Sequence, residues 1–242
     1  VSFAHALVTG GATGIGRAIA LELANAGMEV TICGRRAEPL EKVAAEHPKL
    51  HAMTADVTDE ASVARLYEEA EAARGPFDVV VANAGIASSA PAHKTTLEEW
   101  NRILNVNLTG AFLTVRPALA GMAARGSGRI VFIASVAGLR GAAYVAPYVA
   151  SKHGVVGLTR ALAEELLLSG VTVNAISPGP HDLPIVHQTV PAEKLDQVIA
   201  GIPVRRLGDP AFIAKTVSLL ADEDAAFVTG ACWDINGGLY VR

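Results

Sequence analysis

Seven short apolar runs recur along the sequence, and helix-like stretches separate most of them. The runs span 5–9, 29–33, 50–54, 77–83, 128–135, 171–177 and 231–235. Longer alanine-rich stretches, such as 16–27 and 60–75, have the composition of helices. Strands that are apolar on both faces and alternate with helices indicate a parallel sheet covered on each side. The sequence therefore predicts an α/β fold, a doubly wound parallel sheet in a three-layer sandwich.

The domain organisation is simple. No linker rich in Ser, Pro or charge divides the chain, and no repeat or low-complexity segment is found, so residues 1–242 are expected to form a single domain. The irregular region 178–208 holds five prolines and no strand pattern. An insertion of this kind near the end of a sheet is typical of a substrate lid.

Composition argues against several partners and locations. The formal charge is −4, so the chain lacks the positive field that holds nucleic acid. We find neither a secretory leader nor an apolar run of the roughly 18 residues that cross a membrane. Cys33 and Cys232 form no C-x-x-C motif, which indicates neither a metal site nor a disulfide framework. We therefore expect a cytoplasmic protein without a metal.

A glycine-rich turn joins the first run to the first helical stretch. Gly10, Gly14 and Gly16 have the spacing G-x-x-x-G-x-G. Glycines at such a turn let the backbone approach a pyrophosphate, which the free N–H groups of a helix N-terminus bind. No G-K-[ST] follows, so the turn is not a P-loop. The motif alone leaves open whether this is a dinucleotide site or an ordinary tight turn.

The end of the second run bears on the coenzyme. Dinucleotide folds often place an acid there, which accepts a hydrogen bond from the adenosine ribose. This chain has Gly34, Arg35 and Arg36 instead. The missing acid and the two cations favour a 2′-phosphate, so the pattern predicts NADP (NADPH), with NAD possible. A solvated pair of loop charges is the alternative interpretation.

Tyr148 and Lys152 stand four residues apart in a stretch typical of a helix. Residues at this spacing share a face, so the phenol and the ammonium can point at one site. An ammonium close to a phenol favours the phenolate and lowers the pKa of the tyrosine. The phenol then becomes a usable proton donor or acceptor. Taken alone, the spacing is common on helix surfaces.

Several motifs occur in a fixed order along nearly the whole chain. They are TGGATGIG (9–16), DV (56–57), NAG (83–85), NVNLTG (105–110), IAS (133–135), YVASK (148–152) and NAISPG (174–179). Together they resemble the short-chain dehydrogenase/reductase family, and the stretch APYVASKHGVVGLTRALAEEL is similar to its 3-oxoacyl-thioester and polyketide ketoreductases. The resemblance implies a Rossmann-type sheet of about seven strands and a nicotinamide cofactor.

The resemblance also implies roles for individual residues. Tyr148 would donate a proton to a carbonyl oxygen as hydride arrives, and Ser135 would hydrogen-bond the same oxygen. Lys152 would contact the nicotinamide ribose and lower the pKa of Tyr148, while Asn107 would help to hold a proton-relaying water. Alternatively, Ser135 only forms a turn and Asn107 only bonds backbone in a kinked helix. The implied cofactor-binding residues are Gly10, Thr13, Gly14, Ile15, Gly16, Arg35, Arg36, Asp56 (at the adenine), Val57, Asn83, Gly85, Tyr148, Lys152, Pro178 and Gly179.

Two positions depart from the family's pattern. Leu183 stands where the family often has a threonine that meets the nicotinamide carboxamide, so another group must hold that carboxamide. Thr13 stands where many NADP-preferring relatives have a basic residue, and this weakens the inference drawn from Arg35 and Arg36.

The resemblance predicts an NADP(H)-preferring oxidoreductase that interconverts a ketone and a secondary alcohol, with a small carbonyl or alcohol compound as substrate. One alternative is a regulator or scaffold that binds nucleotide without redox catalysis, and another is an NAD-linked alcohol dehydrogenase of the same family. A lyase or dehalogenase on the same fold is a third. Both Tyr148 and Lys152 are present, which argues against the regulator, and Lys152 argues against the dehalogenase.

The remaining expectations concern the lid and the assembly. Three residues of the lid, His181, Asp182 and His187, could meet a polar group of the substrate, although loop histidines more often face solvent. Relatives pair through long helices, here expected at about 96–124 and 147–168, and through the last strand. These segments are rich in Ala, Val and Leu, so we expect a homotetramer.

Overall fold

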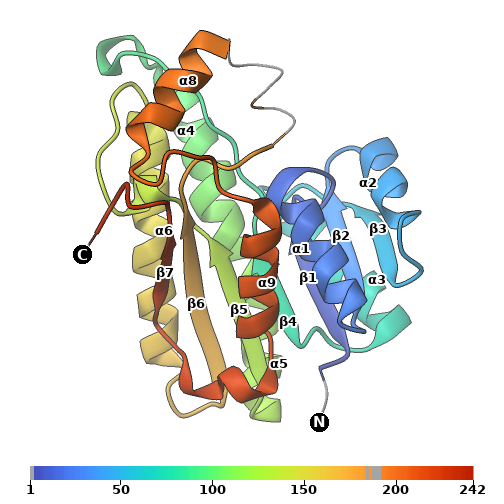
Figure 1. Ribbon diagram of the computed structural model, residues 1–242. Coiled ribbons are helices and arrows are strands. Elements are labelled where there is room, and N and C mark those ends of the chain that lie inside the picture. The colour runs from blue at the N-terminus through green and yellow to red at the C-terminus, as the bar shows by residue number, and fades with distance from the viewer. Residues whose placement is uncertain (1–2, 184–185, 187–191, 242) are drawn as a thin grey trace.

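The computed structural model describes residues 3–183, 186 and 192–241. Seven parallel strands form one sheet in the order β3-β2-β1-β4-β5-β6-β7 (Figure 1). The strands are β1 (His5–Thr9), β2 (Glu29–Gly34), β3 (Leu50–Thr54), β4 (Val79–Ala82), β5 (Gly128–Ile133), β6 (Val171–Pro178) and β7 (Cys232–Ile235). The predicted doubly wound α/β sheet is confirmed.

Helices cover both faces of the sheet, and each face has its own cluster of buried apolar side chains. One cluster includes α1 (Gly14–Asn25), α2 (Ala37–Ala44) and α9 (Pro210–Leu220), and the other includes α3 (Glu60–Arg74), α5 (Gly110–Arg125) and α6 (Ala146–Glu165). Successive residues of a strand point to opposite faces of the sheet. In β1, Leu7 belongs to the cluster with α3, α5 and α6, whereas Ala6 and Val8 belong to the cluster with α1, α2 and α9. Full burial on both faces explains the continuous apolar runs.

The strand order reverses between β1 and β4, which lie side by side although β2 and β3 separate them in sequence. In an open α/β sheet, ligands bind outside the carboxyl ends of the strands at such a reversal. The glycine-rich turn follows β1, and Asn83 follows β4. The fold therefore brings the two motifs to one crevice.

The first of the two expected long helices is interrupted. It consists of α4 (Leu97–Leu104), a π-helical turn (Asn105–Thr109) and α5, where a continuous helix over about 96–124 was expected. The second, α6, ends at Glu165 instead of 168. A π-helical turn widens the helix locally, and such turns occur frequently at functional sites. Here the widened turn contains Asn107.

The irregular region 178–208 lies partly outside the described residues, since 184–185 and 187–191 are not among them. Its second half contains α8 (Ala192–Gly201), which lies beyond the carboxyl ends of the strands, on the same side as α4 (Figure 1). Among the described residues, no helix is long and apolar enough to cross a membrane. The same residues contain no cluster of three or more potential metal ligands.

Candidate active site

Ser135, Tyr148 and Lys152 meet at the carboxyl end of β5. Ser135 follows this strand, and α6 carries the other two, beginning beside Pro147, which suits the first turn of a helix. The Lys152 Nζ donates to the carbonyl oxygen of Ile133 at 2.7 Å and lies 5.8 Å from the centroid of the Tyr148 ring. The Ser135 hydroxyl lies close enough to Tyr148 to act on the pKa of its phenol. The three side chains thus lie close together at this edge of the sheet.

Burial governs the electrostatics of these side chains. Burial raises the pKa of Tyr148 above its ordinary value, although the hydrogen bond with Ser135 acts in the opposite direction. Burial also lowers the pKa of the Lys152 ammonium to about 8. Burial of the phenol thus determines the net direction of the Tyr148 pKa in this structure, and the lowering of that pKa by Lys152 stays a prediction.

Asn107 is buried in the π-helical turn and makes hydrogen bonds to Ile86 and Ser151. Its Oδ1 accepts from the backbone N–H of Ile86 at 2.8 Å, and its Nδ2 donates to the carbonyl of Ile86 at 2.9 Å. The same Nδ2 donates to the Ser151 Oγ at 3.1 Å. Both amide hydrogens are thus used, which ties the segment after β4 to α6. Asn107 therefore bonds backbone, as the structural alternative expects, and it also lies near Lys152 across Gly85. Its role in holding a proton-relaying water stays a prediction.

The glycine-rich turn leaves room for a close approach to α1. Gly10 adopts a positive φ of 67°, which favours glycine. A Cβ on Gly16 would lie 2.3 Å from the carbonyl oxygen of Gly10, so no larger residue fits there. Thr13 precedes the first turn of α1 but makes no side-chain cap, and that turn contains no acid. These features fit a pyrophosphate at the helix N-terminus.

Asn83 holds the two sides of the crevice together. Its Nδ2 donates to the carbonyl of Thr9 at 2.9 Å, and its backbone N–H donates to the Thr9 Oγ1 at 3.1 Å. The backbone N–H of Ala84 donates to the same Oγ1 at 3.1 Å. Asn83 also lines the crevice. It therefore has a structural role, which is to join the ends of β1 and β4, and its place beside the cofactor stays a prediction.

Two adjoining cavities of about 360 and 820 Å³ form a cleft along this edge, and both contain Gly10, Thr13, Arg36 and Gly85. The larger one contains the first turn of α1, including Gly14, Ile15 and Gly16, together with Asp182 and Leu183. A Cβ on Gly85 would lie 3.4 Å from the Asn107 Oδ1 and 3.6 Å from the Lys152 Nζ. The cleft therefore comes close to the Lys152 ammonium at Gly85.

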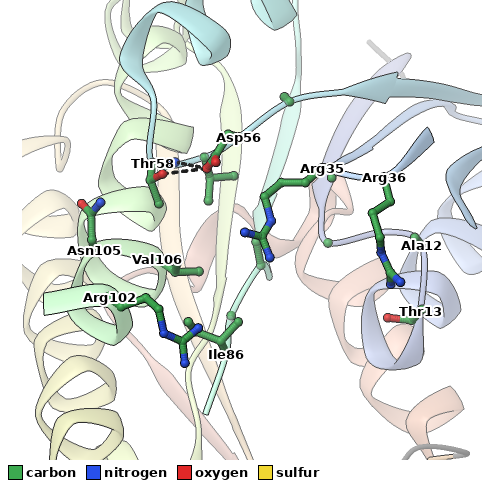
Figure 2. A pocket seen from close by; sticks show the side chains of 16 residues that line it. Ala12, Thr13, Arg35, Arg36, Asp56, Thr58, Ile86, Arg102, Asn105 and Val106 are labelled. Carbon is green, nitrogen blue, oxygen red and sulfur yellow. Dashed lines mark hydrogen bonds between the residues drawn. The ribbon is translucent and has the colours of Figure 1, made fainter. Parts of the chain in front are cut away.

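Cationic and acidic side chains line the smaller cavity. Arg35 and Arg36 enter it from the end of β2, and Arg36 points toward Thr13 (Figure 2). The Asp56 Oδ1 accepts two hydrogen bonds from Thr58, at 2.7 Å from the hydroxyl and 2.9 Å from the backbone N–H. These bonds, and to a smaller extent the Arg35 charge, lower the pKa of the Asp56 carboxyl. Val57 completes this wall.

Pro178 and Gly179 lie at the carboxyl end of β6, and neither lines the two cavities. Pro178 ends β6, and the Gly179 N–H donates to the carbonyl of Ile235 at 2.9 Å. Leu183 lies beside α1, where a Cβ on Gly14 would be 3.7 Å from the Leu183 Cδ1. Leu183 thus presents methyl groups where many relatives present a hydroxyl.

His181 does not face solvent. The residue is buried, its Nδ1 lies 2.8 Å from the carbonyl oxygen of Gly179, and its ring packs against Gly208. It lines a separate cavity next to α9, whereas Asp182 is exposed at the cleft. His187 lies outside the described residues. The expectation of an exposed lid histidine at 181 is wrong, because Gly208 leaves room for the ring against the backbone.

Sequence reasoning missed several residues of the smaller cavity: Ala12, Thr58, Ala84, Ile86, Arg102, Asn105 and Val106. Ala12, Ala84, Asn105 and Val106 lie within the quoted motifs, and Thr58 and Ile86 directly follow two of them, so these six could have been found by reading each motif in full and one position beyond it. Arg102 is different, because it enters from α4, and only its spacing of five residues before Asn107 could have pointed to it.

A family profile described as short chain dehydrogenase matches residues 4–194. The chain belongs to the short-chain dehydrogenase family. Acetoacetyl-CoA reductase of Rhizobium meliloti is 41% identical over 236 residues, which cover 97% of this chain and 98% of that protein. Cis-4-hydroxycyclohexanecarboxylate dehydrogenase of Sinomonas cyclohexanicum is 43% identical over 239 residues, with coverage of 96% and 95%.

One solved structure is also similar to this chain along nearly its whole length. The crystal structure of an actinorhodin polyketide ketoreductase variant with NADPH superposes with a TM-score of 0.93 at 37% identity, covering 98% of this chain and 97% of that one. The resemblance found in the motifs is therefore confirmed. The protein is an NAD(P)-dependent oxidoreductase of the short-chain dehydrogenase family that acts on a ketone or an alcohol.

Proposed function

We propose that the protein is an NADPH-preferring ketoreductase that converts a 3-oxoacyl thioester to the 3-hydroxyacyl thioester. The observation that supports this most is that Lys152, close to Ser135 and Tyr148, lies beside Gly85 in the wall of a cleft that Arg35 and Arg36 also line. The side of Lys152 can hold a reacting carbonyl, and the arginines can bind a 2′-phosphate.

Each of Ser135, Tyr148 and Lys152 has a distinct task in this proposal. The bound nicotinamide supplies the hydride that reaches the carbonyl carbon. Tyr148 transfers its phenolic proton to the carbonyl oxygen, and its raised pKa keeps that proton in place until the oxygen becomes basic. Ser135 donates a hydrogen bond to the same oxygen as negative charge develops. Lys152 binds the nicotinamide ribose and holds a positive charge close to the Tyr148 ring.

The coenzyme is positioned by the residues along the cleft. Gly10, Thr13, Gly14, Ile15 and Gly16 leave the backbone N–H groups of α1 open to the pyrophosphate. Asp56 and Val57 meet the adenine, and Asn83 and Gly85 lie beside the ribose groups. Pro178 and Gly179 face the nicotinamide, and backbone groups there hold its carboxamide, since Leu183 has no hydroxyl. These residues are the cofactor site in our proposal.

The substrate class is proposed from the relatives. Acetoacetyl-CoA reductases and 3-oxoacyl-[acyl-carrier-protein] reductases are 39 to 41% identical to this chain along nearly its whole length. A panel of 3-oxoacyl thioesters, cyclic ketones and quinones, each tested with NADPH, examines the proposal. We expect the highest kcat/KM with acetoacetyl-CoA or a longer 3-oxoacyl thioester. A higher kcat/KM with cyclic ketones would contradict the proposed substrate class while leaving the chemistry intact.

We further propose that residues 1–242 act as one domain in the cytoplasm and that region 178–208 forms the substrate lid. Neither cysteine forms a disulfide within the described residues, and Cys33 is buried, which fits a reducing compartment. Asp182 and Leu183, at the start of the region, already line the cleft.

A homotetramer is the proposed assembly. Leu97, Phe112 and Leu219 are exposed apolar side chains, and α4, α5 and α6 present helix faces that a second copy could cover. We expect light scattering at micromolar concentration to give about four times the monomer mass of 25.0 kDa. A mass near that of the monomer would contradict the assembly.

A further inference from the structure

A third arginine lines the smaller cavity, and none of the family motifs contains it. Arg102 extends from α4 and lies on the side of Ile86 and Val106, whereas Arg36 lies toward Thr13 (Figure 2). The larger cavity contains the first turn of α1, and Arg102 is not among the described residues that line it. Arg102 therefore belongs to the part of the cleft that lies away from that turn.

The smaller cavity has the lining that a flat aromatic base requires. Val57, Ile86 and Val106 give it apolar walls, against which such a base can be buried. Asp56 adds a carboxylate, and two hydrogen bonds from Thr58 lower its pKa, so it stays ionised near neutral pH and can accept from an amine. In the proposed function this is the place of the adenine, whose exocyclic amine is such a donor.

A neighbouring acid orients the Arg102 side chain. The Arg102 Nε donates to the Glu99 Oε2 at 2.6 Å, and the Nη2 donates to the Glu99 Oε1 at 2.8 Å. Two parallel bonds of this kind fix the plane of the guanidinium. The carboxylate occupies one edge of the guanidinium, so this pair leaves the two flat faces of the guanidinium uncovered.

The pairing with Glu99 favours a base over a phosphate as the partner of Arg102. A phosphate would bind the N–H groups of the guanidinium, and there it would meet the negative charge of the Glu99 carboxylate. A neutral base is not repelled, and the face of a guanidinium packs favourably on an aromatic ring. The phosphates of the coenzyme have other partners in the proposed function, namely the N-terminus of α1 for the pyrophosphate and Arg35 with Arg36 for the 2′-phosphate.

We propose that Arg102 is a coenzyme-binding residue whose planar guanidinium stacks on the adenine base. The proposal rests on the proposed function only in that the chain binds a coenzyme with an adenine, and it holds for NADPH and NADH alike. Lysine would not replace this arginine, because an ammonium has a charge but no flat face. Arg102 would thus hold the base from α4, whereas Asp56 meets it from the segment after β3.

The test compares the parent with Arg102→Ala and Arg102→Lys in binding titrations. The fluorescence of the reduced nicotinamide gives Kd for NADPH and for NADH, and displacement of NADH gives Kd for adenosine, which has no phosphate. We expect Arg102→Ala to raise all three dissociation constants by about three- to fivefold, as for a cation on an aromatic ring at an exposed site. Arg102→Lys should show nearly the same loss. Thermal unfolding followed by circular dichroism verifies that each variant is folded.

Reduced nicotinamide mononucleotide is the matched ligand control, because it lacks the adenosine half of the coenzyme. Its affinity in both Arg102 variants should stay within about 1.5-fold of the parent, since the proposed stack is absent from its complex. Lys42→Ala is the matched protein control, since it removes one positive charge and an exposed helical ion pair, that with Glu38, away from the cleft. It should leave every dissociation constant unchanged.

Three results would overturn the proposal. Unchanged affinity of Arg102→Ala for NADPH and NADH would remove Arg102 from the coenzyme site. A loss for the dinucleotides without a loss for adenosine would assign Arg102 to a phosphate, and full affinity in Arg102→Lys would show that only the charge is needed. A parent that binds neither dinucleotide would contradict the proposed function itself, and the role of Arg102 with it.

Discussion

Replacing Tyr148 with Phe is expected to slow hydride transfer by about 10²–10⁴-fold, the usual contribution of a general acid. The ring still fits its place in α6, but the proton that the phenol gives to the carbonyl oxygen is gone. Coenzyme affinity should remain nearly unchanged, since in the proposed mechanism the hydroxyl meets the substrate carbonyl. Single-turnover measurement of NADPH oxidation, with substrate in excess, separates the chemical step from product release.

Tyr144→Phe is the control for this prediction. Tyr144 lies four residues before Tyr148, and its side chain is 64% exposed, so the loss of its hydroxyl should leave the rate unchanged. Lys152→Ala should behave differently from both, because it impairs coenzyme binding as well as the rate. A Tyr148→Phe rate within about threefold of the parent would remove Tyr148 from the proposed role.

The coenzyme preference has the second largest expected effect. We expect kcat/KM for NADPH to exceed that for NADH by at least about tenfold, because a hydrogen bond to a charged group contributes about 1.5–3 kcal/mol. Gly34 has no carboxylate to repel a 2′-phosphate. Arg35, which lines the same cavity, can donate two hydrogen bonds to that phosphate from its planar guanidinium. Steady-state kinetics with both coenzymes at fixed substrate and low salt measure the ratio.

The double variant Gly34→Asp with Arg35→Ala should reverse this order. A Cβ on Gly34 would lie 3.9 Å from the Leu40 Cδ1, an ordinary contact, so an aspartate fits there and can accept from the adenosine ribose. Arg74→Ala, which removes a charge at the end of α3, controls for net charge. Equal kcat/KM values for NADPH and NADH in the parent would mean that Arg35 and Arg36 are only a solvated pair of loop charges. That result would favour the NAD-linked alternative.

The sheet was predictable because its central strands, β1, β4, β5 and β6, are buried along their whole length. Each strand ends within two residues of the apolar run that predicted it, from His5–Thr9 to Cys232–Ile235. The glycine-rich turn was likewise predictable, since only glycine permits the approach of Gly16 to the Gly10 carbonyl. Local sequence determines such features, so a motif is enough to find them.

Other features depend on contacts between distant segments, and the sequence did not reveal them. The π-helical turn around Asn107 is a local widening within an otherwise helical pattern, which periodicity does not detect. His181 is buried only because Gly208, far along the chain, leaves space for its ring. The raised pKa of Tyr148 follows from burial that the i, i+4 spacing with Lys152 does not show. Arg102 joins the cleft through the packing of α4.

The central claim is that the protein transfers hydride from NADPH to a ketone. Its most direct test is one turnover with NADPH that carries deuterium at the transferable position of C4, followed by mass spectrometry of the product. With acetoacetyl-CoA or another 3-oxoacyl thioester, we predict a 3-hydroxyacyl thioester with deuterium on the carbinol carbon and an equal amount of NADP⁺. Tight binding of NADPH without its oxidation by any ketone in the panel would contradict the account and favour a nucleotide-binding regulator.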